Sequence, residues 1–253
     1  MSPEDIAAIE QATLAAVSPE AVEAWPGWLL PFDSGPIGRA KSAAPLSHEA
    51  PAEDISSRIA AAYRARGLAP AFRLPALPAF DPLRADLAAR GYRPSQPTCL
   101  QCAPAADVAA RAPAPPDAPA RIEVARDAGE DWASLFLGEG FDPVEGAGRV
   151  ASLRRGQASL FATLYDHEGR PAAAGALACH AGWGGIHGMR TARAQRGQGH
   201  AARVVGALAR EAMARGVTRL FLQVEVDNAP ALALYGRLGF ETQWVYAYWR
   251  PGD

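Results

Sequence analysis

The pattern of apolar and polar positions is clearest in the last third of the chain. Residues 185–191 resemble a short strand, and residues 196–201 form a glycine-containing turn. After this turn, apolar side chains recur at helical spacing until Gly216, which is a stop signal. They are Val204, Val205, Leu208 and Ala212. The pattern therefore predicts a strand, a tight turn and a helix in direct succession.

The rest of the C-terminal half alternates between strand and helix periods. Strands are predicted at residues 121–125, 158–164, 171–180 and 220–226, with a last strand that ends at Trp249. Helices are predicted at residues 131–137, 143–155 and 231–238. This alternation predicts a mixed α/β (α+β) fold, in which helices flank a twisted sheet.

The N-terminal half shows a similar order of elements. Helices are predicted at residues 5–17, 54–66 and 82–90, and strands at 28–32, 37–46, 72–74 and 98–102. A tight turn is predicted at residues 33–35. Residues 104–120, rich in proline and alanine, read as an extended linker. We therefore predict two domains, residues 1–103 and 121–253.

Composition narrows the classes of partner. The chain has 253 residues and a formal net charge of −2, which gives no electrostatic footprint for nucleic acid or for an anionic membrane. It has no apolar run long enough to span a bilayer and no secretory signal at the N-terminus. We expect a cytoplasmic protein, as a monomer or a homodimer.

Three cysteines raise the question of a metal or redox site. Cys99 and Cys102 have the spacing of such a pair, but no second pair exists, and Cys179 stands alone. On a strand, residues three apart point to opposite faces, so these two thiols would diverge. Buried strand cysteines are therefore the preferred interpretation, and no metal site is expected.

The turn at residues 196–201 carries the chemistry. Gly197 and Gly199 allow the backbone to come close to a phosphate, and the following helix presents free N–H groups and a positive end to it. Arg196 adds a charged donor. The turn matches neither of the common nucleotide-binding loops, because Lys41 is the chain's single lysine and Arg203 stands where a third glycine is needed. Alone, it predicts only an anion cradle or an ordinary turn.

Two motifs together resemble the GCN5-related N-acetyltransferase (GNAT) superfamily. Residues 196–201, Arg-Gly-Gln-Gly-His-Ala, match its Arg/Gln-x-x-Gly-x-Gly/Ala signature. Residues 228–240, from Asn228 through Leu234-Tyr235 to Gly239-Phe240, resemble its second signature. The motifs stand in the right order and at the right separation. The resemblance implies that the C-terminal domain is an acetyltransferase with acetyl-CoA as cosubstrate.

The N-terminal half is similar to a degenerate repeat of the same fold. Residues 82–92 echo residues 231–240, and both segments end in glycine and an aromatic residue. Where the glycine turn should precede a helix, residues 47–53 instead contain two carboxylates and Pro51. They would repel a pyrophosphate and remove a donor. We therefore predict tandem GNAT-like domains with a single active site; an unrelated N-terminal domain is the alternative.

The resemblance implies roles for particular residues. The pyrophosphate would bind the backbone of the loop: Arg196, Gly197, Gln198, Gly199, His200 and Ala201. The strand residues Met189, Arg190 and Thr191 would pair with the pantetheine arm, and Asn228 would both contact the cofactor and cap its helix. His200 either adds a phosphate contact or faces solvent. Tyr235 would protonate the departing thiolate, unless it only packs in the core.

The proton acceptor and the acyl acceptor are less defined. Glu225 and His187 are the candidates for the general base, and both have a structural role as the alternative. Gln223 is a candidate for orienting the acceptor. No charge cluster indicates an anionic or cationic acceptor. The acceptor site is expected around residues 135–149 and 246–249, with the N-terminal half as a further candidate contributor. Four aromatic residues either form an apolar wall or fill the core: Phe141, Trp183, Trp244 and Trp249.

The favoured function is acetyl transfer to a primary amine of a small molecule or amino acid-like acceptor. Two other functions stay open: a non-catalytic sensor that holds acyl-CoA, and an interaction module whose N-terminal half forms an interface. Stabilisation by acetyl-CoA separates these hypotheses, because a ligand that binds only the folded state raises the melting temperature.

Overall fold

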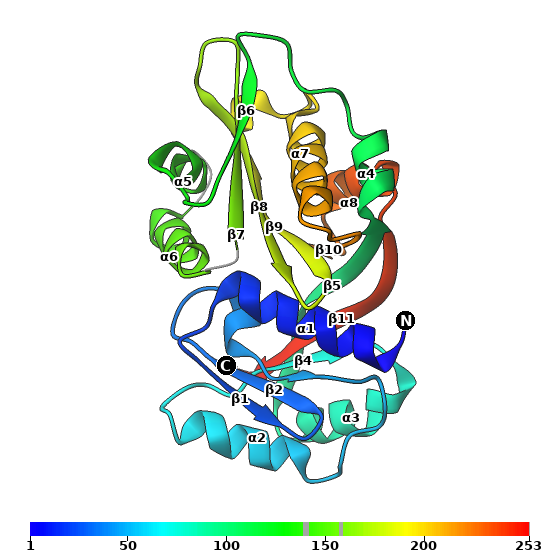
Figure 1. Cartoon of the computed structure of the whole chain (residues 1–253). Helices are drawn as coiled ribbons and strands as arrows, with labels where there is room; N and C mark the ends of the chain where they lie inside the picture. The colour runs from blue at the N-terminus through cyan, green and yellow to red at the C-terminus, as the bar shows by residue number, and fades with distance from the viewer. Residues whose placement is uncertain (139–141, 157–158, 253) are drawn as a thin grey trace.

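The computed structural model describes residues 1–138, 142–156 and 159–252, and an eight-stranded sheet runs through it (Figure 1). In spatial order its strands are β4 (Phe72–Pro75), β11 (Glu241–Pro251), β5 (Tyr92–Pro104), β10 (Arg219–Glu225), β9 (Trp183–Thr191), β8 (Pro171–His180), β7 (Ser159–Tyr165) and β6 (Arg121–Ala125). Neighbouring strands pair antiparallel, except β9 and β10, which are parallel. The mixed sheet confirms the predicted fold class.

Helices cover both faces of this sheet (Figure 1). One face carries α4 (Ala105–Arg111), α7 (His200–Ala214) and α8 (Ala229–Arg237); the other carries α1 (Pro3–Val17), α5 (Glu130–Leu137) and α6 (Pro143–Arg154). Successive residues of β7 serve the two faces, because Phe161 packs with the α5 side and Ala162 with the α7 side. The apolar stripe predicted for α7 is fully buried at Val204, Val205, Leu208 and Ala212.

The N-terminal half adds a smaller sheet with its own core. This sheet contains β1 (Ala21–Trp25), β2 (Trp28–Phe32) and β3 (Ala44–Pro45), and α2 (Ile55–Arg64), α3 (Asp81–Ala89) and the short turn η2 (Pro78–Phe80) lie near it. The predicted strand at residues 37–46 is wrong. A 3₁₀ turn, η1 (Gly38–Lys41), replaces its first part, and only Ala44–Pro45 at its end forms a strand, β3. The Ser42 hydroxyl donates to the carbonyl of Gly38 at 2.8 Å. Strand β1 escaped prediction because most of its side chains are exposed.

The two halves share the large sheet. Strand β5 belongs to the N-terminal half in sequence, yet it pairs with β10 on one side and β11 on the other. Strand β11, the end of the chain, reaches back to pair with β4. Cys99 and Cys102 of β5 pack on opposite faces, as their spacing predicts. The two halves are therefore joined by strand pairing. The domain boundaries at 103 and 121 stay a prediction.

The predicted linker is not extended throughout. Residues 105–111 form α4, because Ala105 and Val108 stand one helical turn apart and are fully buried against α7. Gly206 on α7 permits this contact, since a Cβ there would lie 2.3 Å from the Cβ of Ala112. Among the described residues, no helix is both long and apolar enough to cross a membrane.

Candidate active site

The site begins where two parallel strands separate. Strands β9 and β10 pair only from Trp183 and Arg219 to Ile186 and Leu222. Beyond this point β9 stays paired with β8, and β10 stays paired with β5. The edge of β9 that faced β10 therefore offers backbone donors and acceptors to a ligand, as an added strand would need.

A bulge bends β9 away from β10. The register between β8 and β9 shifts between Ala174 and Ala176, opposite Gly188, whose φ of +62° is in the left-handed region. The bulge redirects the carbonyl of Gly175, which accepts a hydrogen bond of 2.9 Å from the indole nitrogen of buried Trp132. Helix α5 thus holds the bulge in place from the far face, and the opening between the strands is built into the sheet.

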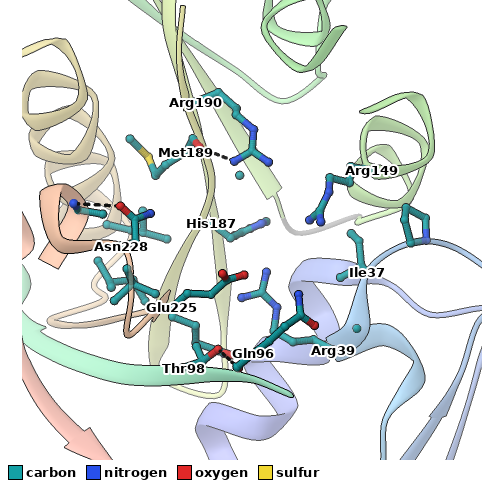
Figure 2. A pocket seen from close by; sticks show the side chains of 18 of the residues that line it. Ile37, Arg39, Gln96, Thr98, Arg149, His187, Met189, Arg190, Glu225 and Asn228 are labelled. Carbon is teal, nitrogen blue, oxygen red and sulfur yellow. Dashed lines mark hydrogen bonds between the residues drawn. The ribbon is translucent and has the colours of Figure 1, made fainter. Parts of the chain in front are cut away.

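A cavity of about 340 Å³ occupies this opening (Figure 2). Its walls come from β9, β10, α8, α6, β5, β11 and the η1 segment. The lining includes the three predicted catalytic residues Tyr235, Glu225 and His187, and the predicted cofactor residues Met189, Arg190 and Asn228. The structure therefore brings together candidates that lie up to 48 positions apart (187 to 235).

Tyr235 lies on α8 with 8% of its surface exposed. Burial raises the pKa of its hydroxyl to about 12, and the nearby charge of Arg190 opposes this shift. The ring packs edge-on against Phe240, with centroids 5.9 Å apart. Asn228 fixes the start of α8, because its Oδ1 accepts a 3.3 Å hydrogen bond from the backbone N–H of Ala231. Tyr235 is thus a protonated donor on a capped helix.

His187 and Glu225 differ strongly in environment. His187 is buried on β9, and neither ring nitrogen has a hydrogen-bond partner among the described residues. Burial lowers the pKa of His187 to about 3, and the charge of Arg39 adds to this shift. The imidazole is therefore neutral and a weak proton acceptor. Glu225 is exposed at the end of β10, where a proton can pass to water.

The predicted phosphate loop lies beside the cavity and is not part of its lining. Strand β9 ends at Thr191, and the 3₁₀ turn η3 (Arg193–Gln195) leads into the loop. Gly197 and Gly199 have φ angles of +79° and +75°, and Gly199 is the residue before α7. Both glycines therefore occupy backbone conformations that other residues rarely adopt, and the first amides of α7 have no intrahelical partner.

His200 is partly exposed, and its interpretation as a phosphate contact or a solvent-facing residue stays open. Its two ring nitrogens are buried and have no hydrogen-bond partner among the described residues. Burial lowers its pKa, with the charge of Arg203 as a second cause. Arg203 folds back over the loop and donates to the carbonyl of Gln198 at 3.0 Å. Imidazole nitrogens buried without a partner at the start of a helix fit a site that a ligand completes.

The cavity also contains residues that sequence reasoning missed. They are Arg39 of η1, Gln96 and Thr98 of β5, and Arg250 of β11, which line it together with Arg190 and with Arg149 of the expected acceptor segment. No charge cluster was expected, and this expectation is wrong. These arginines are separated by up to 211 positions (39 to 250), so no local pattern connects them.

The acceptor region is only partly as predicted. Arg149, Tyr246 and Tyr248 line the cavity, but three of the four candidate aromatic residues are core residues outside it: Trp183, Trp244 and Trp249. The fourth, Phe141, lies outside the described residues. Gln223 is held on both ends, since it donates to the Thr13 hydroxyl at 2.9 Å and accepts from the Tyr246 hydroxyl at 2.6 Å. No group of three or more potential metal ligands is found within the described ranges.

Comparison with known proteins agrees with the resemblance to N-acetyltransferases. The family model described as "Probable histone acetyltransferase Rv0428c C-terminal" matches residues 4–249. The curated protein "Uncharacterized N-acetyltransferase YobR" of Bacillus subtilis (strain 168) is 33% identical over 111 residues. That segment covers 43% of this chain and 44% of YobR, so the match spans less than half of the relative.

Solved structures show the fold. A GCN5-related N-acetyltransferase from Kribbella flavida superposes with a TM-score of 0.69 at 17% identity, covering 97% of this chain and 95% of that one. A tandem GNAT protein from the clavulanic acid biosynthesis pathway gives a TM-score of 0.62 at 18% identity, with coverages of 98% and 96%. Because the family model spans nearly the whole chain, this protein belongs to the Rv0428c C-terminal acetyltransferase family and has a tandem GNAT fold.

Proposed function

We propose that this chain transfers an acetyl group from acetyl-CoA to the primary amine of a small acceptor. The observation that carries the proposal is the opening between β9 and β10, where a free strand edge, a protonated tyrosine and a glycine loop lie next to one another. Family membership supplies the reaction class.

The residues present fit the cosubstrate. The edge of β9 that faces away from β8, at residues 189–191, suits an amide-bearing arm laid along the strand. Beside it, the amides from Gly197 to Ala201 and the positive end of α7 suit a pyrophosphate, and a Cβ on Gly197 would disturb only its left-handed backbone. Bound acetyl-CoA would supply an activated thioester.

The chain's own groups then handle the protons. Tyr235 keeps its proton at neutral pH and can donate it, or a hydrogen bond, to a developing thiolate. The attacking amine must lose a proton. Glu225 is the better acceptor of the two candidates, because it reaches water, whereas His187 is held neutral and suits the role of a hydrogen-bond partner that orients the acceptor.

The family description raises a competing acceptor, the lysine side chains of a histone. The cavity argues against it. Arginines from four elements line the walls, and Glu225 is the sole carboxylate among the described lining residues. A positively charged wall repels a lysine-rich chain. A small acceptor is therefore the proposed class.

The decisive experiment replaces Tyr235 with phenylalanine and follows thiol release from acetyl-CoA with a panel of amines. We expect Tyr235→Phe to lower kcat about 100-fold and to leave CoA binding unchanged, because a general acid contributes to the chemical step alone. Tyr165→Phe is the matched control. Tyr165 is also buried with a raised pKa, but its hydroxyl bonds Asp131 at 3.0 Å, away from the cavity.

Two outcomes would contradict the proposal in different ways. Equal rates for the native chain and Tyr235→Phe across the pH range would remove the acid role. Stabilisation by CoA with no acetylated product from any amine would instead favour a sensor that holds acyl-CoA without turnover.

A further inference from the structure

One side of the cavity collects positive charge from segments that are far apart in sequence. Arg39, Arg149 and Arg190 direct their guanidinium groups into the same space in Figure 2, with His187 between them. Arg250 of β11 also lines this space. Three elements of the C-terminal half and η1 of the N-terminal half therefore meet at one point.

The packing of η1 keeps Arg39 at this point. A Cβ on Gly38 would lie 3.0 Å from ring carbons of Tyr248 and 3.0 Å from a guanidinium nitrogen of Arg250. The absence of a side chain at Gly38 thus lets η1 lie against β11. On the other side of Arg39, Ala40 is fully buried, so the turn is anchored and its arginine projects from a fixed position.

Arg39 and Arg250 have no carboxylate partner within the described residues. Arg39 forms no ion pair or hydrogen bond in the described part of the chain, although its charge acts to lower the pKa values of His187 and Glu10. Arg250 donates to neutral oxygens, those of Ser95 at 2.9 Å and Gln96 at 3.1 Å. Arg149 pairs with Glu145 at 2.5 Å, but this pair is on the surface of α6 and is easily redirected.

The backbone of Gln96 supports the interpretation of the arginine cluster as a binding site. It has a φ of +51°, rare for a residue with a side chain, at an irregularity in the pairing of β5 with β11. Such backbone strain is concentrated at functional sites. The strained residue holds Arg250 by its side-chain oxygen and lines the cavity.

An arginine cluster beside an amine-binding site has two physical effects. Planar guanidinium groups bind a carboxylate through paired hydrogen bonds. Positive charge also lowers the pKa of a nearby ammonium group, so the amine loses its proton more readily and can attack. The first effect favours an acceptor that carries a carboxylate, and the second helps the amine of that acceptor to react.

We propose that Arg39 and Arg149 bind the carboxylate of the acceptor, so that the substrates are small amines of the amino acid type. This inference rests on the proposed function, because it names the acceptor for the same site. Arg39 and Arg149 lie across the cavity from Asn228, with His187 and Glu225 between them, so an acceptor bound by its carboxylate directs its amine toward the β9–β10 opening (Figure 2). The cavity of about 340 Å³ is large enough for a small acceptor of this kind.

The test compares L-amino acids with the amines that lack their carboxylate: tyrosine with tyramine, phenylalanine with phenethylamine, and lysine with cadaverine. A lysine-rich peptide is a fourth arm. Acetyl transfer from acetyl-CoA is measured by thiol release, and binding of the same compounds to the CoA-loaded chain is measured by calorimetry. We expect the carboxylate-bearing member to have the higher kcat/KM and the tighter binding, by about tenfold or more for the preferred side chain.

Variants assign the effect to the arginines. Arg39→Gln is expected to raise KM for the amino acid about 10- to 100-fold and to leave its decarboxylated partner unchanged, since a charged hydrogen bond is lost. Arg39→Lys should recover part of the loss. Arg210→Gln, at an exposed position on α7, is the matched control and should change neither.

Three results separate the inference from the proposed function. Better transfer to, or binding of, the decarboxylated amines or the lysine-rich peptide would overturn the inference and leave acetyl transfer intact. An equal effect of Arg39→Gln on both members of a pair would do the same. If CoA does not raise the melting temperature and no amine is acetylated, the proposed function fails and the inference fails with it.

Discussion

The loop at residues 196–201 and the segment at residues 47–53 occupy corresponding places in the two halves of the chain, between a strand and a helix. In the first, two glycines in the left-handed region lead into α7, a 15-residue helix. In the second, α2 follows Asp54, which has a right-handed helical backbone and makes no capping hydrogen bond with its side chain. The first segment exposes a row of amides, whereas the second offers exposed carboxylates and Pro51.

The N-terminal half contributes to the other end of the site instead. It supplies Arg39, Gln96 and Thr98 to the one cavity that also contains Tyr235. Its own cavity, about 270 Å³, is lined by Trp25, Trp28 and Glu49 among others. We therefore expect a single active site per chain, in which the N-terminal half supplies one wall of the cavity.

The largest expected effect concerns a buried ion pair within the N-terminal half, between two elements that both pack on the shared sheet. Arg73 of β4 and Glu10 of α1 form a hydrogen-bonded ion pair in which both side chains are almost fully buried. Burial opposes the charge of Arg73, but Glu10 raises its pKa. Arg73→Met leaves a buried carboxylate without its partner, so we expect the free energy of unfolding to fall by about 3–5 kcal/mol in urea titrations.

Two controls interpret this result. Arg66→Met removes an exposed pair with Glu23 and should cost less than about 1 kcal/mol. The double variant Glu10→Leu, Arg73→Met should lose less than Arg73→Met alone, because no buried charge remains. An Arg73→Met variant as stable as the native chain would show that the fold does not depend on this buried ion pair.

The second effect compares a histidine from each half. Burial holds the pKa of His187 at about 3, far below the value of about 6.5 for an unfolded chain. Between these pH values the unfolded state binds more protons than the folded state. The contribution of His187 to the free energy of unfolding is therefore fully present above about pH 6.5. It falls as the pH falls, by at most about 1.4 kcal/mol per pH unit. His187→Asn should flatten this acid dependence by about 2 kcal/mol between about pH 7 and pH 5.

His48 is the matched residue of the N-terminal half. It lies in the segment at residues 47–53, partly buried, and stacks edge-on against Trp244 at 4.8 Å. Burial lowers the pKa of His48 as well, but His48 is only partly buried, whereas His187 is buried. His48→Asn should therefore change the acid dependence less. Equal changes, read from urea unfolding at both pH values, would show that the cavity gives His187 no special environment.

Sequence reasoning succeeded where local patterns decide structure. The apolar stripe of α7, the two left-handed glycines and the cap by Asn228 were all predictable, because each depends on residues within one or two turns. The position of β5 between β10 and β11 could not be predicted, since strand pairing across more than 100 residues leaves no periodic signal. Arg39 was missed for a related reason: it lies in the 3₁₀ turn η1 where a strand was predicted, and the residues that line the cavity with it are distant in sequence.

The third effect compares two glycines with nearly the same backbone. Gly197 and Gly67 have φ angles of +79° and +70°, and a Cβ would meet no atom within 4 Å at either position. Alanine should cost about 1 kcal/mol of stability in each case, because of the left-handed backbone alone. Only Gly197→Ala should also weaken CoA binding, about tenfold, by shifting the loop amides. Calorimetry with CoA measures this, and equal affinities of the two variants would remove the loop from the cofactor site.

The smallest expected effect is none at all. In the double variant Glu49→Gln, Glu53→Gln, the segment at residues 47–53 loses its repulsion toward a pyrophosphate but gains no donors, because Pro51 still lacks an N–H and no left-handed turn precedes α2. We therefore expect calorimetry to show a single CoA per chain before and after the change. A second bound CoA would mean that charge alone had excluded the cofactor from the N-terminal half. The difference between the halves would then lie in two carboxylates and not in the geometry of the backbone.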